Sequence, residues 1–160
     1  MKPDDSPLLD ARSTLQQIAD NAMLAVYAKD FDGRLLFVNR EFERIAGRPV
    51  DAIVGRLDTE IFPAATAEGF RRNDRRVLEE LRALEFEEPV EVGGEKRVYL
   101  SQKFPLLRPD GRAYAVCGVS TDITERKRAE EALRAAATAV SAEGGESVFG
   151  TLTRAIAAIL

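Results

Sequence analysis

Histidine is absent from this sequence of 160 residues, and its absence excludes several kinds of site at once. Without an imidazole, the chain cannot offer a histidine ligand to haem or zinc, nor the general base of a Ser-His-Asp triad. A phospho-accepting histidine within the segment is excluded for the same reason. We therefore expect no metal site and no catalytic residues, and we expect that this chain is not an enzyme by itself.

Cysteine is nearly absent as well, since Cys117 is the only one. A single cysteine cannot form an intrachain disulfide, which favours a reducing, cytoplasmic compartment. No apolar run approaches the roughly 20 residues of a membrane-spanning helix, and the N-terminus lacks the apolar core of a signal peptide. We therefore expect no direct membrane contact from this segment.

Neither sign of charge is in large excess. The 27 acidic and 23 basic residues give a net charge of −4 and a pI of about 5.1. This mild acidity predicts no nucleic-acid partner. What the sequence does contain is a globular composition, with 45% hydrophobic and 31% charged residues.

The order of the patterned segments predicts the fold class. The expected elements are a helix at 8–20, a hairpin of strands 22–29 and 34–39, short helices within 40–46 and 50–61, a long helix at 64–84, strands at 85–92, 96–107 and 112–122, and a helix from 124 onwards. Runs of strands and runs of helices of this kind indicate an α+β domain with one antiparallel sheet.

The long predicted helix has an apolar face that includes two polar residues. The apolar positions are Phe70, Val77, Leu78, Leu81 and Leu84. The opposite, solvated face carries Arg71, Arg72, Arg75 and Arg76. Asn73 and Asp74 lie on the apolar side, where unpartnered polar groups are costly. They either line a ligand pocket between helix and sheet or bond to nearby backbone and side chains, and the sequence leaves both interpretations open.

The last predicted strand leads directly into a charged, alanine-rich helix. Ala129, Leu133, Ala136 and Val140 form a short heptad-like seam that is compatible with a coiled coil, and the run at 141–146 (SAEGGE) breaks it. At the junction, Asp122 and Thr124 are placed where a side chain can cap the helix N-terminus by accepting backbone N–H bonds.

Several short motifs, taken in order, resemble those of PAS sensor domains from bacterial signalling proteins. They are 27–30 (YAKD) with Asp32-Gly33, 37–39 (FVN), Phe42 with 45–47 (IAG), 58–63 (DTEIFP), Asn73-Asp74, Glu87-Glu88, 103–105 (KFP), Asp110-Gly111 and 118–133 (GVSTDITERKRAEEAL). The resemblance covers residues 20–134, and the last motif is its most specific part. It implies a PAS fold, in which a five-stranded antiparallel sheet has helices packed on one face and is flanked by an N-terminal helix and a C-terminal linker helix.

The resemblance also divides the chain into four parts. These are an N-terminal flanking helix at 1–20, a PAS sensory domain at 21–123, a coiled-coil-like linker at 124–143, and the start of a following domain at 144–160. Residues 147–160 resemble the opening helix of a GAF domain, and the alternative is a helix that extends the linker. The apolar end of the chain leads us to expect a longer parent protein.

Similarity to flavin-binding members of the family implies which residues face a ligand. Strand alternation leaves two registers for residues 97–104: one points Tyr99, Ser101 and Lys103 inward, and the other points Val98, Leu100, Gln102 and Phe104 inward and leaves a drier core. We favour the first. The implied ligand-binding set is Tyr27, Phe70, Asn73, Asp74, Val77, Tyr99, Ser101, Lys103, Val116, Gly118 and Ser120. Within it, Lys103 is expected to pair with Asp74 or with an anionic ligand.

Known cofactors of the family fit this sequence poorly. Light-sensing flavin domains carry a reactive cysteine in an Asn-Cys-Arg-Phe context, and the matching stretch here has none. Haem sensors use a histidine, which is absent. We therefore expect neither flavin nor haem, and the ligand stays unknown. Cys117 is expected to point away from the pocket and to pack as a small apolar group.

The resemblance implies a sensory module of a multidomain regulator such as a histidine kinase, cyclase or phosphatase. Acting as a homodimer, it would bind a small molecule or relay conformation through the linker helix to a downstream effector in the same chain, with Asp122 and Thr124 as a lever. One alternative is a ligand-free dimerisation module that uses the helices at 8–20 and 124–140. Another is a small enzyme on a similar α+β fold.

Overall fold

The computed structural model describes residues 11–142 and residue 157. The predicted helix start at 8–10, residues 143–146 of the predicted break, and the GAF-like segment at 147–160 apart from residue 157 lie outside the described residues. The first two residues of the break predicted at 141–146 are helical instead. The chain forms two compact units, Met1–Asp122 and Ile123–Leu160. The predicted division into four parts stays a prediction.

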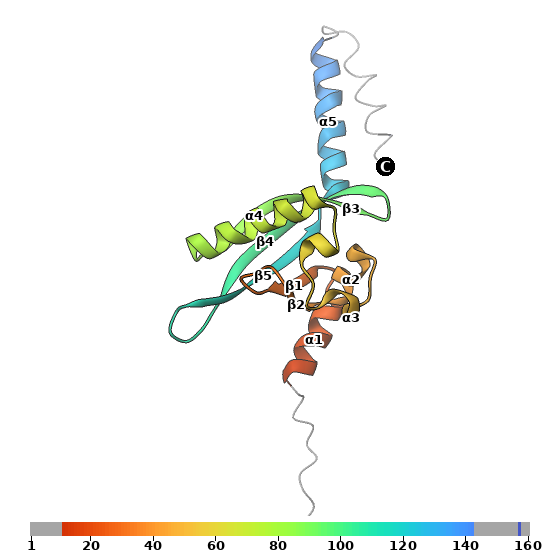
Figure 1. Ribbon diagram of the computed structural model, residues 1–160. Helices are drawn as coiled ribbons and strands as arrows, with labels where there is room; N and C mark the ends of the chain where they lie inside the picture. The colour runs from red at the N-terminus through yellow and green to blue at the C-terminus, as the bar shows by residue number, and fades with distance from the viewer. Residues whose placement is uncertain (1–10, 143–156, 158–160) are drawn as a thin grey trace, which may run out of the picture. The chain divides into compact units, whose positions relative to one another are not determined.

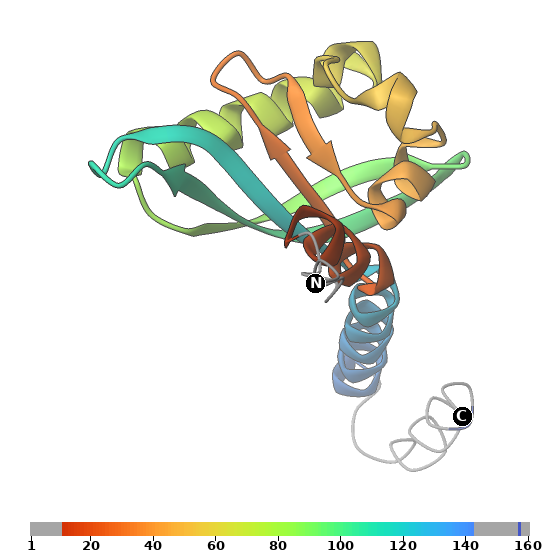
Figure 2. The same ribbon diagram turned by 90° about the horizontal axis from the view of Figure 1, so that it is seen from below.

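Five strands form one antiparallel sheet in the order β2-β1-β5-β4-β3. In chain order the elements are α1 (Ala11–Asn21), β1 (Ala25–Lys29), β2 (Leu35–Val38), α2 (Arg40–Ala46), α3 (Val50–Ile53), the 3-10 helix η1 (Asp58–Glu60), α4 (Ala64–Glu80), β3 (Leu84–Val92), β4 (Glu95–Leu107), β5 (Ala113–Asp122) and α5 (Thr124–Ala142). Helices α2, α3 and α4 cover one face of this sheet (Figure 1, Figure 2). The predicted α+β class and five-stranded architecture are therefore confirmed.

Asn39 joins three elements at the start of the domain and is fully buried. Its side-chain oxygen accepts hydrogen bonds from the backbone N–H groups of Val26, at 2.9 Å, and Phe42, at 3.1 Å. Its amide nitrogen donates to the carbonyl oxygens of Ala19 and Leu24. One side chain thereby caps α2 and fixes the ends of α1 and β1 against each other, because a buried amide needs all of these partners.

The long helix ends earlier than its apolar pattern predicts. It stops at Glu80, because Leu81 adopts a left-handed backbone conformation with a φ of 49°. Leu81 is consequently 54% exposed, and Leu84 is buried in β3 instead of on the helix. The prediction that both leucines lie on the buried face of a helix at 64–84 is wrong, because the chain reverses to pair β3 with β4.

The first strand is shorter than expected, since it begins at Ala25 and not at residue 22. The short helices expected within 50–61 are found as two pieces, α3 and η1, and Gly55 between them has a φ of 84°. That left-handed conformation suits glycine and cannot continue a right-handed helix.

Helix α5 forms the described part of the second unit. Arg126 pairs with Glu130 and Arg128 with Glu125 along its surface, at spacings that place side chains on one side of a helix. Of its predicted apolar seam, Leu133 is exposed and the side chain of Val140 lies outside the described residues. No helix in the described part of the chain is both long and apolar enough to span a bilayer.

Candidate functional site

Three strands present alternate side chains to the layer between the sheet and the helices. On β4, Tyr99, Ser101 and Lys103 are buried whereas Gln102 is exposed, so the strand has the first of the two predicted registers. The inward residues of β1 are Ala25, Tyr27 and Lys29. Those of β5 are Val116, Gly118 and Ser120.

Five charged side chains from five different elements meet in this layer. This ion cluster consists of Lys29, Asp58, Asp74, Glu88 and Lys103. The Nζ atom of Lys29 lies 2.6 Å from Asp58 Oδ2 and 3.0 Å from Asp74 Oδ2. The Nζ atom of Lys103 lies 2.8 Å from Asp74 Oδ1 and 2.7 Å from Glu88 Oε1. Asp74 therefore bridges both lysines. Of the two partners predicted for Lys103, Asp74 or an anionic ligand, the pairing with Asp74 is confirmed.

Burial of these charges is expensive, on the order of several kcal/mol for each ion, unless pairing offsets it. Lys29 is 2% exposed and Lys103 is fully buried. Burial by itself lowers the pKa of each lysine, but the adjacent carboxylates outweigh it and the pKa of both ends above the usual value. The cluster thus keeps both ammonium groups charged.

The two aspartates respond to burial in opposite ways. Burial raises the pKa of Asp74, but the charges of Lys29 and Lys103 outweigh this effect and hold that pKa below its usual range. Asp58 has one lysine neighbour at hydrogen-bond distance, so burial prevails and its pKa is raised. Of the two aspartates, Asp58 therefore takes up a proton more readily.

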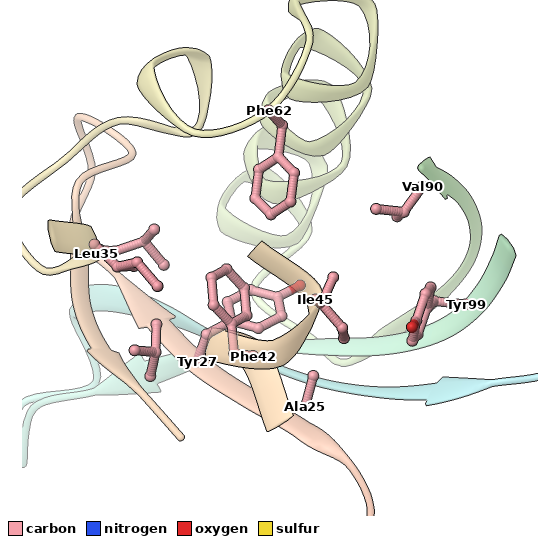
Figure 3. Packing of buried hydrophobic residues seen from close by; sticks show 10 residues of the cluster. Ala25, Tyr27, Leu35, Phe42, Ile45, Phe62, Val90 and Tyr99 are labelled. Atoms are coloured by element: carbon pink, nitrogen blue, oxygen red, sulfur yellow. The ribbon is translucent and has the colours of Figure 1, made fainter. Parts of the chain in front are cut away.

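Aromatic rings fill the rest of the layer. This aromatic cluster consists of Tyr27, Phe42, Phe62 and Phe70, with successive ring centroids 5.3, 6.0 and 5.4 Å apart. Figure 3 shows the rings of Tyr27, Phe42 and Phe62 gathered between the sheet and the helical segments. The Nζ atom of Lys29 lies 5.0 Å from the Tyr27 ring centroid and 5.3 Å from that of Phe70, within the range of a cation–π contact. The two clusters are thus in direct contact.

Gly118 allows the Tyr27 ring to lie flat against β5. The two residues are register partners on adjacent strands. A Cβ atom at position 118 would overlap the Cζ and Oη atoms of Tyr27. Glycine is required here by close approach, since its backbone conformation is an ordinary one.

The cavity left between the two clusters is about 30 Å³, room for roughly one water molecule. Pockets that enclose drug-sized ligands are larger, from roughly 300 Å³ upwards. Among the described residues, two buried polar atoms on lining residues lack a hydrogen-bond partner, Asp58 Oδ1 and Tyr99 Oη.

The predicted ligand-binding residues are distributed over several places. Those that line the cavity are Tyr27, Phe70, Tyr99, Ser101 and Ser120. The two serine hydroxyls are 2.8 Å apart and bond to each other. Asp74 and Lys103 belong to the ion cluster, and Asn73 donates to Glu88 at 2.9 Å. Asn73 and Asp74 thus have side-chain partners, which was the second interpretation that the sequence left open.

Val77 and Val116 lie apart from the cavity. They pack with Leu84 in a second apolar cluster between α4 and the sheet. Ligand binding by the eleven predicted residues stays a prediction.

Three charged residues of the site were missed by sequence reasoning, namely Lys29, Asp58 and Glu88. Strand alternation could have found two of them, because Lys29 shares a face with Tyr27 and Glu88 shares a face with Val90. Asp58 lies on a one-turn helix with no periodic pattern, so nothing in its spacing indicates that it is buried.

The strand–helix junction contains the two residues predicted to act as a lever. Asp122 ends β5 and accepts a hydrogen bond from Arg97 at 2.8 Å, and the buried Thr124 begins α5. Their capping and lever roles stay predictions.

Cys117 is half-buried on the sheet face opposite the inward residues, and burial raises the pKa of its thiol to about 11.

A family model for the PAS fold matches residues 19–128, more than half of the chain. The match ends before residue 147, so it gives no support to a GAF domain at the C-terminus. Over 113 residues the chain is 33% identical to the uncharacterized protein y4lL of Sinorhizobium fredii, with 69% of this chain and 14% of that protein covered. Over 112 residues it is 30% identical to the methanogenesis regulatory histidine kinase FilI of Methanothrix harundinacea, with 70% and 13% covered. The chain therefore spans about one-seventh of the length of these relatives.

Solved structures have the same fold. The PAS domain of BvgS from Bordetella pertussis matches with a TM-score of 0.62 and 24% identity, covering 78% of this chain and 95% of that domain. A VqmA–ligand–DNA complex of Vibrio cholera matches with a TM-score of 0.62 and 22% identity, covering 69% of this chain and 51% of that chain.

The VqmA complex corrects one prediction. The mild acidity of the sequence predicts no nucleic-acid partner, yet a chain with this fold is found in complex with DNA. The prediction is therefore wrong. The match covers about half of the VqmA chain, so a chain with this fold contains further residues outside the matched part. The net charge of one domain does not limit what the rest of a longer chain binds.

Proposed function

This chain is a member of the PAS fold family, and on that basis we propose that it is a sensory signalling module. It transmits a conformational change to an effector while its interior stays closed to ligands. The relay runs along β5 into α5. The segment itself performs no catalysis in this proposal, and its output is received by an effector in the same chain.

The observation that carries this proposal is the filled interior. Five charged side chains and four aromatic rings occupy the layer between sheet and helices and leave about 30 Å³. Opening this layer for a large ligand would separate buried ion pairs, which costs several kcal/mol. Repacking of these side chains without separating the ion pairs is a smaller rearrangement than opening the layer. In this proposal, such repacking shifts strand β5.

Strand β5 is the element best placed to transmit such a change. It lies between β1 and β4 in the sheet, and its inward residue Gly118 is the register partner of both Tyr27 and Lys103. The strand therefore touches the aromatic cluster on one side and the ion cluster on the other. It ends at Asp122, and α5 begins two residues later, so any shift of β5 is passed along the covalent chain.

The nature of the output is taken from a relative. FilI is a histidine kinase, and the matched segment is 13% of its length. We propose by this similarity that the present chain belongs to a larger regulator of the two-component type. Its single cysteine favours a cytoplasmic location.

Hydrogen exchange of the 160-residue chain tests the relay. Lys103→Met should accelerate amide exchange in the first turns of α5 more than in α1, because Lys103 pairs with β5 and bridges two carboxylates. Lys96→Met, an exposed lysine on the same strand, is the matched control and should leave α5 unchanged. Equal exchange in α5 for wild type and both variants would contradict the relay.

Native mass spectrometry tests the closed interior separately. The purified chain should be detected at its bare mass. A small molecule retained in stoichiometric amount would contradict the closed interior and favour binding by the predicted ligand-binding set.

A second candidate function is dimerisation, and it is favoured by exposed apolar residues on α1. Leu15 and Ile18 are 65% and 64% exposed at a spacing that places them on one side of the helix. A second copy of the chain would cover them. Sedimentation of Leu15→Glu/Ile18→Glu tests this function: the wild type should be a dimer and the variant a monomer, and an unchanged sedimentation coefficient would exclude α1 as the interface.

A further inference from the structure

A groove of about 200 Å³ opens where the turn between β1 and β2 faces α4, beside η1. The turn and α4 lie next to each other in Figure 2. This hairpin groove has apolar walls from Phe31, Leu57 and Leu78, and two guanidinium groups, Arg71 and Arg75. It is distinct from the interior cavity, although Asp58 lines both.

Arg71 and Arg75 have side-chain N–H donors that are not used in hydrogen bonds within the described residues. Arg71 and Arg75 are one helical turn apart on α4, so their side chains leave the helix on the same side. Both are exposed. Arg71 donates to the carbonyl oxygen of Asp32 at 3.3 Å. Within the described residues, Arg75 has no hydrogen bond or ion pair, whereas Arg76 on the same helix pairs with Glu80.

Each carboxylate that lines the groove has a partner on at least one oxygen, although Asp58 Oδ1 has none. Asp30 Oδ1 accepts backbone N–H bonds from Asp32 and Arg34. Asp58 and Asp74 on the groove wall are held by the lysines of the ion cluster. Within the described residues, no ion pair joins Arg71 or Arg75 to these carboxylates, which have their partners in backbone N–H groups and in the two lysines. Both guanidinium groups therefore have N–H donors left to bind an anion from solution.

We propose that the hairpin groove binds a small organic dianion of the short dicarboxylate class. Arg71 and Arg75 would each donate to one carboxylate, a pairing that guanidinium geometry favours. The carbon spacer would lie against Phe31, Leu57 and Leu78. The groove volume equals that of about seven water molecules, which suits a compact dicarboxylate.

Binding in this groove would act on the interior without opening it. The carboxylates of Asp58 and Asp74 line the groove and also hold Lys29 in the ion cluster. A dianion next to them changes the electrostatic potential at the cluster directly. Only this consequence rests on the relay proposed above, and binding itself does not depend on it.

Titration of the 160-residue chain with succinate at constant ionic strength, followed by amide chemical shifts, tests the proposal. Succinate should shift residues around the groove. Arg71→Gln/Arg75→Gln should weaken binding by about tenfold or more, a loss of about 1.4 kcal/mol or more, because both guanidinium groups that face the dianion are removed. Arg72→Gln/Arg76→Gln removes the same charge from the same helix and should bind within about twofold of wild type, because neither residue lines the groove.

Three outcomes would overturn the proposal. The first is the absence of any succinate-dependent shift at millimolar concentrations, and the second is equal weakening in both double variants. The third is inorganic phosphate binding more tightly than succinate, because it would mean that the apolar walls contribute nothing. Unchanged hydrogen exchange in α5 would contradict the relay and leave this site intact, so the two proposals fail separately.

Discussion

The ion cluster and the aromatic cluster share one buried layer but hold it together in different ways. Charges in the ion cluster meet at 2.6 to 3.0 Å, and each contact depends on one particular partner atom. Rings in the aromatic cluster lie 5.3 to 6.0 Å apart, and their attraction is spread over many atoms. Loss of one member should therefore leave an uncompensated charge in the first cluster and only a gap in the second.

Distance alone does not explain the importance of an ion pair. The pair between Arg44 and Glu41 on α2 has the same 2.6 Å separation as Lys29 and Asp58. Arg44 is half exposed, so water and salt screen that pair, and it is worth about 0–1 kcal/mol. Burial makes the partner in the ion cluster indispensable, because a lone buried charge has no solvent to replace it.

The largest expected effect comes from breaking the ion cluster at Lys103. Lys103→Met should reduce the free energy of unfolding by about 3–5 kcal/mol, because it leaves two buried carboxylates short of a partner. Urea denaturation measures this loss. Lys96→Met on the exposed part of β4 should change it by less than about 0.5 kcal/mol. Similar losses in both variants would mean that the cluster contributes no more than surface charge.

A smaller effect is expected from the aromatic cluster. Gly118→Ala should reduce the free energy of unfolding by about 1–3 kcal/mol, since the added methyl group overlaps the Tyr27 ring. In a Tyr27→Leu background the same change should cost much less, because the ring atoms that clash are gone. A double-mutant cycle measures this coupling, and strictly additive losses would show that the two residues do not interact.

The smallest expected effect is a pH dependence that originates at Asp58. Burial raises its pKa in the folded chain, with Lys29 opposing, so the folded state keeps a proton that the unfolded state, with a pKa of about 3.9, has lost. The contribution of Asp58 to stability therefore falls as pH rises through its folded pKa. Asp58→Asn should gain in stability relative to wild type as pH increases from about 4 towards 7.

Urea denaturation at several pH values follows that difference. Asp51→Asn, at an exposed position on α3, is the control for the loss of one carboxylate. A pH-independent difference between Asp58→Asn and wild type would contradict the uptake of a proton at this position.

The predicted inward residues included the aromatic and hydroxyl groups of the site more completely than its charges. Alternation along β4 left two registers open, and similarity to flavin-binding members of the family favoured the one that points Tyr99, Ser101 and Lys103 inward, as their burial confirms. The expected pairing of Lys103 with Asp74 is also confirmed. The end of α4 was mispredicted because the apolar period continues past Leu81. No residue type near this position indicates that the backbone of Leu81 is left-handed. Lys29 and Asp58 were missed because lysine and aspartate usually lie at the surface.

The sequence by itself determined the class of fold and the turn at Asp30, because these depend on neighbours close in the chain, and it left two registers open for residues 97–104. Only the tertiary structure decided that two lysines and three carboxylates from β1, η1, α4, β3 and β4 pair with one another in one small volume. The physical reason is that the cost of a buried charge depends on what lies within about 4 Å of it. Which groups come within this distance depends on how the elements pack against one another, and the spacing of residues along the chain does not predict it.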